Sequence, residues 1–197
     1  TGYVFSHNGT DYSFEVLDTG KLTVKAKVLE AAIAATTREY DGTTSIFGSA
    51  ANLNNAVSVT TGVGSETLTV TASTGEFDSA NAGARQWTID GIALADGSGT
   101  ASNYVLKSTR VSGSGTIDKR AIDATVSGLK IYDGTTTLED ATVTLNNLVV
   151  GDNITLDLDA NFADANAGTG KALTLTNKVL SGADAANYIV SADSDIS

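Results

Sequence analysis

The chain has 197 residues, and its 12 Lys and Arg against 23 Asp and Glu give a net charge of −11. This acidity opposes a phosphate backbone, so we expect no nucleic-acid partner. No apolar run approaches the ~18 residues of a spanning helix, which argues against membrane insertion. The absence of cysteine excludes disulfides and thiolate metal sites. The length leaves room for two small domains rather than one large one.

The chain begins with a predicted hairpin. Asn8-Gly9 separates two alternating segments, 3–6 and 12–16. Asn-Gly between such segments is the strongest short-range signal for a hairpin turn. Residues 1–22 are therefore interpreted as an N-terminal hairpin or the tail of a preceding repeat.

Strands are predicted next at 22–28, 31–38, 56–60, 66–72, 86–94 and 104–111. The alanine-rich segment 29–35 favours a helix by propensity alone. Its counterpart later in the chain, 122–127, alternates apolar and polar residues as a strand does. Since equivalent segments share a fold, we interpret both as strands.

The remainder of the chain shows the same pattern more clearly. Ala141, Val143 and Leu145 alternate with threonines, and so do Leu173 and Leu175. This period of two indicates strands with one buried and one exposed face. Residues 181–186 predict one short helical turn before a last strand at Tyr188.

The chain is organised around a repeated pentapeptide. Tyr40-Asp41-Gly42-Thr43-Thr44 recurs 92 positions later as Tyr132-Asp133-Gly134-Thr135-Thr136. Two further pairs recur at offsets of 85 and 84: Phe77 with Phe162, and Asn103 with Asn187. The sequence thus predicts two copies of one unit, at 23–115 and 116–197.

The predicted fold is all-β: two tandem small β-sandwich or β-grasp-like domains after the short N-terminal hairpin. A β-helix is not expected, because its coils would repeat at a much shorter period.

The ordered motifs resemble a known family. Tyr-Asp-Gly-Thr-Thr is followed by 151–156 (Gly-Asp-Asn-Ile-Thr-Leu), by 162–168 and by 180–188. This series is similar to the YDG repeat of filamentous-haemagglutinin-type adhesins and related large bacterial surface proteins. The resemblance implies a structural or spacer module of an exported adhesin, extracellular or on the bacterial cell surface, with a role in attachment or biofilm formation. The implied partners are neighbouring repeats of the same long chain, with a host or matrix glycan or protein left open.

The repeated residues have structural interpretations. In each pentapeptide, Asp-Gly predicts a tight turn, and the preceding tyrosine is expected to bury its ring while its hydroxyl stays hydrated. Phe77 and Phe162 are expected to be core anchors. The segment 164–168 (Asp-Ala-Asn-Ala-Gly) predicts a turn capped by its aspartate.

A binding role has one aromatic candidate. Trp87, the only tryptophan, could form a platform for a carbohydrate or protein. Because it aligns with the inward position Leu173, we expect it to be buried.

Metal binding and catalysis have weak candidates. Asp157, Asp159 and Asp164 form the one oxygen-rich cluster that resembles a Ca²⁺ site. The first copy has Thr71, Ser73 and Glu76 in that region, so a site would belong to one copy only, and we expect no metal and no cofactor. With His7 as the single histidine and no nucleophile motif, we expect no enzyme activity.

Overall fold

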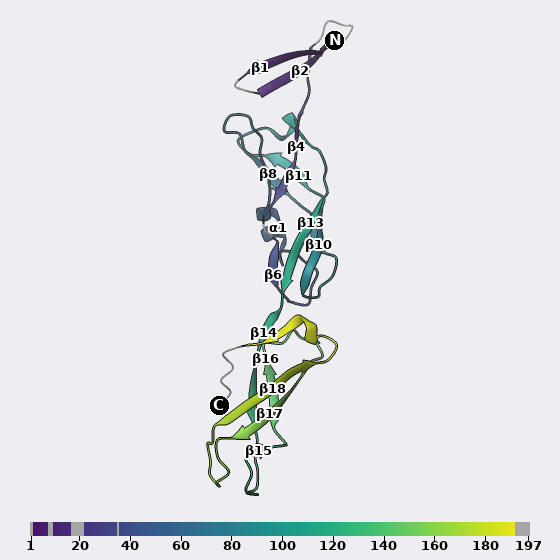
Figure 1. Cartoon of the computed structure of the whole chain (residues 1–197). Coiled ribbons are helices and arrows are strands. Elements are labelled where there is room, and N and C mark those ends of the chain that lie inside the picture. Colours follow the sequence, from purple (N-terminus) through teal and green to yellow (C-terminus); the bar gives the residue numbers. More distant parts are fainter. Residues whose placement is uncertain (1, 8–9, 17–21, 35, 192–197) are drawn as a thin grey trace. The chain divides into compact units, whose positions relative to one another are not determined.

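The computed structural model describes residues 2–7, 10–16, 22–34 and 36–191 (Figure 1). The regular structure of the described chain consists mainly of short strands, with one α-helix and two 3-10 turns. The all-β prediction is confirmed. Among these residues, no helix has both the length and the apolar character needed to cross a membrane.

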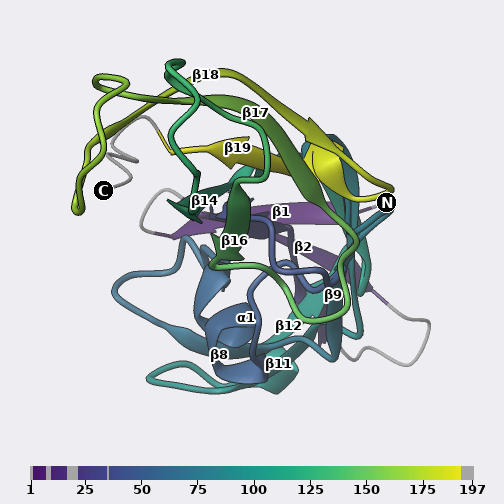
Figure 2. The ribbon, with the colours of Figure 1, turned by 90° about the horizontal axis from the view of Figure 1, so that it is seen from below.

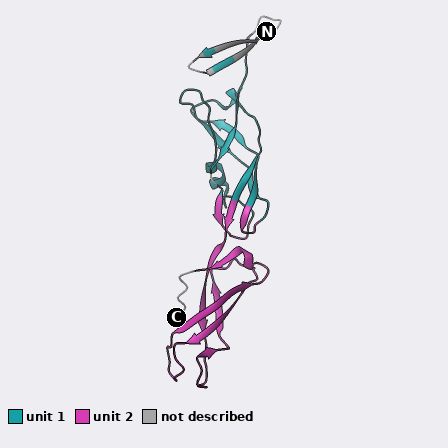
Figure 3. Ribbon diagram, in the orientation of Figure 1, with its two compact units in different colours: residues 1–36, 44–79, 85–115 teal, residues 37–43, 80–84, 116–197 magenta. Residues whose placement is uncertain are grey.

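The chain forms two compact units (Figure 3). Unit 1 comprises residues 1–36, 44–79 and 85–115, and unit 2 comprises 37–43, 80–84 and 116–197. The contacts therefore place two short segments of the first sequence copy, 37–43 and 80–84, in unit 2. One of these segments contains the first pentapeptide's tyrosine.

The N-terminal strands are β1 (Gly2–His7), β2 (Thr10–Val16) and β3 (Leu22–Val24), and they form one antiparallel sheet. The pairing of His7 with Thr10 leaves two residues between the strands, as the predicted hairpin requires. The hairpin is confirmed, although the Asn8-Gly9 turn itself lies outside the described residues. β3 adds a third strand that the sequence did not predict for this sheet.

The first copy contains β4 to β12 and the first part of β13, which continues into the second copy. Their bounds are β4 Lys27–Leu29, β5 Ala31–Ile33, β6 Thr37–Glu39, β7 Val57–Val59, β8 Leu68–Thr71, β9 Thr74–Phe77, β10 Gly83–Asp90, β11 Ala93–Asp96, β12 Tyr104–Leu106 and β13 Val111–Asp118. Four strands form a sheet in the order β6-β13-β10-β9, and the others pair as β11 with β8, β12 with β4 and β5 with β7.

The predicted strands in this copy are interrupted. The segment 31–38 divides into β5 and β6, and 86–94 divides into β10 and β11 at Gly91, whose φ of 67° a strand does not allow. The segment 29–35 is extended where described, so its interpretation as strand is confirmed. β9 was not predicted, because its sequence, Thr-Gly-Glu-Phe, has little apolar alternation.

Unit 2 contains two three-stranded sheets, in the orders β16-β14-β19 and β15-β17-β18. The strands are β14 Arg120–Ser127, β15 Thr137–Leu138, β16 Thr142–Asn146, β17 Thr155–Phe162, β18 Leu173–Ser181 and β19 Tyr188–Val190. β17 and β18 run side by side (Figures 1 and 2). The predicted helical turn is present as η2 (Ala185–Asn187).

The two copies share a topology as well as a sequence pattern. β12 pairs in parallel with β4, Tyr104 opposite Lys27, and β19 pairs in parallel with β14, Tyr188 opposite Arg120. In β14, alternate residues are buried, with Ile122 fully so. The equivalent pairings indicate that the duplicated sequence folds twice in the same way.

Helix α1 (Ala50–Ala56) distinguishes the copies. Ser49 caps it, its Oγ accepting from the Asn52 backbone N–H at 3.2 Å, and Leu53 on its inner face is buried. Leu53 packs so closely on Gly75 that a Cβ there would lie 2.8 Å from Leu53 Cδ1. The seven residues of α1 lie in the interval where the offset falls by seven, from 92 to 85. The helix is therefore an insertion in the first copy, and the sequence analysis did not predict it.

Candidate functional site

The first pentapeptide forms the predicted turn. Gly42 has a φ of 79°, in the left-handed region that suits glycine. Asp41 Oδ1 accepts from the Thr43 backbone N–H at 2.9 Å and from Thr43 Oγ1 at 2.8 Å, and it pairs with Arg38 at 2.6 Å. Burial alone would raise the pKa of Asp41, but the Thr43 hydrogen bonds and Arg38 outweigh it and hold the pKa below its usual value.

The second pentapeptide forms the same turn. Gly134 has a φ of 82°, and Asp133 Oδ1 accepts from the Thr135 backbone N–H at 2.8 Å and from its Oγ1 at 2.9 Å. Lys130 takes the place of Arg38, 2.9 Å from Asp133. Lys130 and then the Thr135 bonds lower the pKa of Asp133 to about 2. The local sequence therefore determines the turn in both copies.

The two tyrosines differ. Tyr40 is 3% exposed, whereas Tyr132 is 67% exposed. The prediction of a buried ring is confirmed for Tyr40 and is wrong for Tyr132. Since the turns match, the difference arises from what packs against each ring.

Tyr40 belongs to a cluster with Tyr188 and Asp152, which we call the tyrosine–aspartate cluster. Both hydroxyls donate to Asp152 Oδ2, from Tyr40 at 2.9 Å and from Tyr188 at 2.6 Å. The rings meet edge to face, with centroids 5.4 Å apart and an interplanar angle of 73°. Tyr188 Oη also accepts from the Val149 backbone N–H at 3.0 Å.

The cluster's electrostatics keep both hydroxyls protonated. Burial is the main cause, and the hydrogen bond to Asp152 is the next; together they raise the pKa of each tyrosine to about 12. A protonated hydroxyl is the donor that a carboxylate needs. The arrangement is therefore a charge-assisted pair of hydrogen bonds that holds two chain segments together.

A second contact lies in the same unit. Asn187 is buried; its Oδ1 accepts from the Ala82 backbone N–H at 2.9 Å, and its Nδ2 donates to Asn81 Oδ1 at 3.4 Å. Gly42 lies against Val149, where a Cβ would come within 2.8 Å of Val149 Cγ1. These contacts fix the segments 37–43 and 80–84 within unit 2.

Unit 1 contains an acid–tyrosine pair that matches Asp152 and Tyr188 of unit 2. Tyr104 is buried and its hydroxyl donates to Glu66 Oε2 at 2.5 Å, which matches Tyr188 on Asp152. The turns that hold the acids also match: Glu66 N–H donates to Val63 O at 3.0 Å, and Asp152 N–H donates to Val149 O at 3.2 Å. The hydrogen bond to Glu66, followed by burial, raises the pKa of Tyr104.

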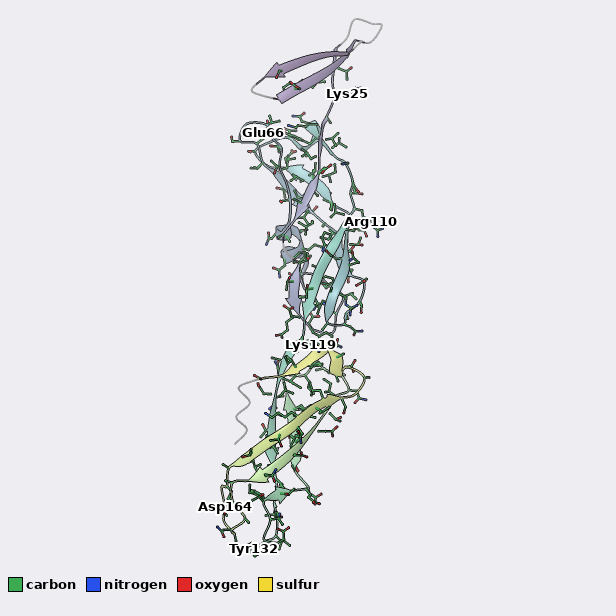
Figure 4. The ribbon with its side chains drawn as sticks, in the orientation of Figure 1. Lys25, Glu66, Arg110, Lys119, Tyr132 and Asp164 are labelled. Carbon is green, nitrogen blue, oxygen red and sulfur yellow. The ribbon has the colours of Figure 1, made fainter. Side chains whose placement is uncertain are left out.

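The acid–tyrosine pair of unit 1 differs from that of unit 2 in the residues that cover it. Asn103, equivalent to the buried Asn187, is exposed. A cavity of about 520 Å³ lies here, lined in part by Glu66, Asn103, Tyr104 and Lys25. Glu66 and Lys25 are labelled in Figure 4. The acid–tyrosine pair is thus present in both copies, and only in unit 2 is a pentapeptide tyrosine bound to it.

The two predicted core anchors differ in how deeply they are buried. Phe77 is buried, as expected. Phe162 is only half-buried and lines a cavity of about 530 Å³ together with Tyr132 and Asp164. The predicted turn after it is confirmed, because Asp164 Oδ1 accepts from the Asn166 backbone N–H at 2.8 Å.

Trp87 is 9% exposed, so its predicted burial is confirmed. Its indole ring packs on Gly113, where a Cβ would lie 2.5 Å from Trp87 Cζ2. The ring is not available as a surface platform in this structure.

The three candidate calcium ligands have separate partners. Asp157 accepts from Ser181 Oγ at 3.4 Å, Asp159 accepts from Asn177 Nδ2 at 2.5 Å, and Asp164 pairs with Lys171. Lys171 also holds the pKa of Asp164 below its usual value. Within the described part of the chain, no three His, Asp or Glu side chains gather as a metal site would require.

Comparison with known families agrees with the duplicated topology. The model of the YDG domain matches residues 24–111 and again 118–195, which together cover most of the chain. The chain belongs to the YDG domain family. No curated protein and no solved structure matches it. The Tyr-Asp-Gly turn is therefore present in each of two YDG domains.

Sequence reasoning missed the partners of the YDG tyrosine. Asp152 and Tyr188 were seen as parts of separate motifs, not as one cluster. The sequence did contain a signal for this contact, because both copies have an acid followed by a tyrosine at a similar distance, as Glu66 with Tyr104 and as Asp152 with Tyr188. The long separation of Tyr40 from Asp152 hid the contact.

Proposed function

We propose that this pair of YDG domains is a structural spacer module of an exported bacterial surface adhesin, with a role in attachment or biofilm formation. In this role, the domains would separate a binding region from the cell. The supporting observation is that the residues common to both copies serve turns and packing.

The shared polar residues are used within the fold. Asp41 and Asp133 bind their own turns, while Asp152 and Glu66 accept from buried tyrosines. A binding or catalytic module usually presents such groups toward an open site. Here the carboxylates are already bound by the chain's own donors, which supports a mechanical role.

The alternative is a carbohydrate- or protein-binding module of the same adhesin. The feature that favours it is the exposed ring of Tyr132 beside the 530 Å³ cavity. An exposed aromatic ring next to a hollow is a common platform for sugars. The buried Trp87 is no longer the candidate for this role.

A glycan array and a matrix-protein binding screen with the whole chain distinguish the two functions. For the spacer, we expect no selective binding. Selective binding that Tyr132→Ala abolishes and Tyr40→Phe retains would favour the alternative. The surface location is tested separately by antibody labelling of intact cells that produce the parent protein; labelling only after permeabilisation would contradict it.

A further inference from the structure

We propose that the Tyr132 end of unit 2 is a docking surface for the acid–tyrosine–asparagine end of another YDG domain. This end comprises residues 129–134, which are exposed except for the half-buried Lys130, and its occupant presents the equivalents of Asp152, Tyr188 and Asn187. The inference deepens the proposed spacer role, because it names the surfaces through which such domains stack.

The first argument is the identity of the two YDG turns. Both hold a left-handed glycine, an aspartate that accepts two hydrogen bonds from the threonine two positions later, and a basic residue three positions before that aspartate. The first turn carries a tyrosine that is bound by Asp152 and Tyr188. The second carries the same side chain, 67% exposed. The Tyr132 turn is thus already in the conformation that the bound turn adopts.

The second argument is the apolar surface around Tyr132. Leu129 is 91% exposed and Ile131 is 89% exposed. Exposed large apolar side chains grouped in this way mark interaction surfaces. Gly134 has no atom within 4 Å of the position of a Cβ, whereas Gly42 is covered by Val149. Docking would cover Gly134 in the same way.

The third argument is the backbone before the turn. Residues 37–39 form β6, which pairs in parallel with residues 116–118 of β13, and Tyr40 N–H donates to Asp118 O at 2.9 Å. The equivalent residues 129–131 are not in a strand in this structure. Their backbone can take a strand from a docked domain, as an open sheet edge does.

The fourth argument is complementarity within one YDG domain. In unit 2, Tyr132 lies at one end, and η2 with β19, in yellow, lies at the other (Figures 1 and 4). The tyrosine–aspartate cluster includes the first residue of β19. One domain therefore presents a tyrosine turn at one end and the site for such a turn at the other. Contacts of this head-to-tail kind produce linear arrays.

The experiment lengthens the chain by one domain. Residues 114–197 are repeated after Ser197, so that the added copy follows the second as the second follows the first. We expect the amides of residues 129–135 to exchange as slowly as those of 37–43. Tyr132→Ala, harmless in the original chain, should then destabilise the lengthened one by about as much as Tyr40→Ala does. Asp152→Ala in the added copy should restore fast exchange.

A second fusion protein provides the same test if the first one does not fold. Residues 21–113 are added instead, which presents Glu66, Tyr104 and Asn103 as the docking partner. Slow exchange at 129–135 in either folded fusion supports the proposal. Unprotected amides beside an added copy whose own amides are protected would overturn it. That result would leave the spacer function standing, whereas glycan binding would reject the spacer function without affecting the exchange result.

Discussion

The YDG turns at Tyr40 and Tyr132 have nearly the same sequence and the same internal hydrogen bonds, yet one tyrosine is buried and the other is exposed. The turn is therefore a local structure, and burial of its tyrosine is a tertiary event. The comparison teaches that the pentapeptide serves two purposes. Its Asp-Gly-Thr part builds the turn, and its tyrosine presents a ring for another element to bind.

The largest expected effect separates the two tyrosines. Tyr40→Ala should lower the free energy of unfolding by about 3–5 kcal/mol, the usual cost of removing a buried aromatic ring. Tyr132→Ala should change it by less than about 0.5 kcal/mol, because exposed side chains contribute little. Urea unfolding followed by circular dichroism measures both. Equal decreases in the free energy of unfolding for the two variants would show that the two tyrosines contribute equally to stability.

The glycines give a smaller, matched contrast. Gly42→Ala and Gly134→Ala both place a Cβ at a positive φ, which costs about 1–2 kcal/mol. Gly42→Ala also forces a Cβ against Val149, and such overpacking adds about 1–3 kcal/mol. Thermal melts of the two variants test this order. A Gly134→Ala variant as unstable as Gly42→Ala would show that the open turn is covered.

The pH dependence tests the tyrosine–aspartate cluster. The folded pKa of Tyr40 and Tyr188 is raised from 10.0 to about 12, so folding favours their protonated form. Their contribution to stability is complete below pH 10 and is lost as the pH rises toward about 12. Unfolding measurements across this range should show the loss, and Tyr40→Phe should reduce it. Tyr132→Phe is the control and should leave the pH dependence unchanged.

The smallest effect concerns helix α1, the second difference between the copies. Ser49→Ala removes the side chain that caps the helix and should cost about 1 kcal/mol. The fluorescence of Trp87, which lies in unit 1, reports the change during denaturation. Ser58→Ala, an exposed change in β7, is the control. A loss of stability in Ser58→Ala without one in Ser49→Ala would contradict a stabilising role for the cap.

Much of the architecture could be predicted because its signals are local. Alternation predicted strands, Asp-Gly predicted both turns, and repetition with offsets of 92, 85 and 84 predicted two copies of one unit. The drop in the offset between the copies from 92 to 85 also indicated a seven-residue insertion in the first copy, where α1 lies. Its seven residues, Ala-Ala-Asn-Leu-Asn-Asn-Ala, have no alternation to mark them, and the serine cap alone is a weak signal.

The sequence alone determined the turns, the all-β class and the duplication, because each depends on residues close together in the chain. Only the tertiary structure decided which YDG tyrosine is buried, since the acid that binds Tyr40 is Asp152, 112 positions away. It also decided that Asp157, Asp159 and Asp164 have separate partners, and the register of β17 with β18 shifts between the first two. Burial and clustering depend on which distant segments meet, and a pattern within one segment does not contain that information.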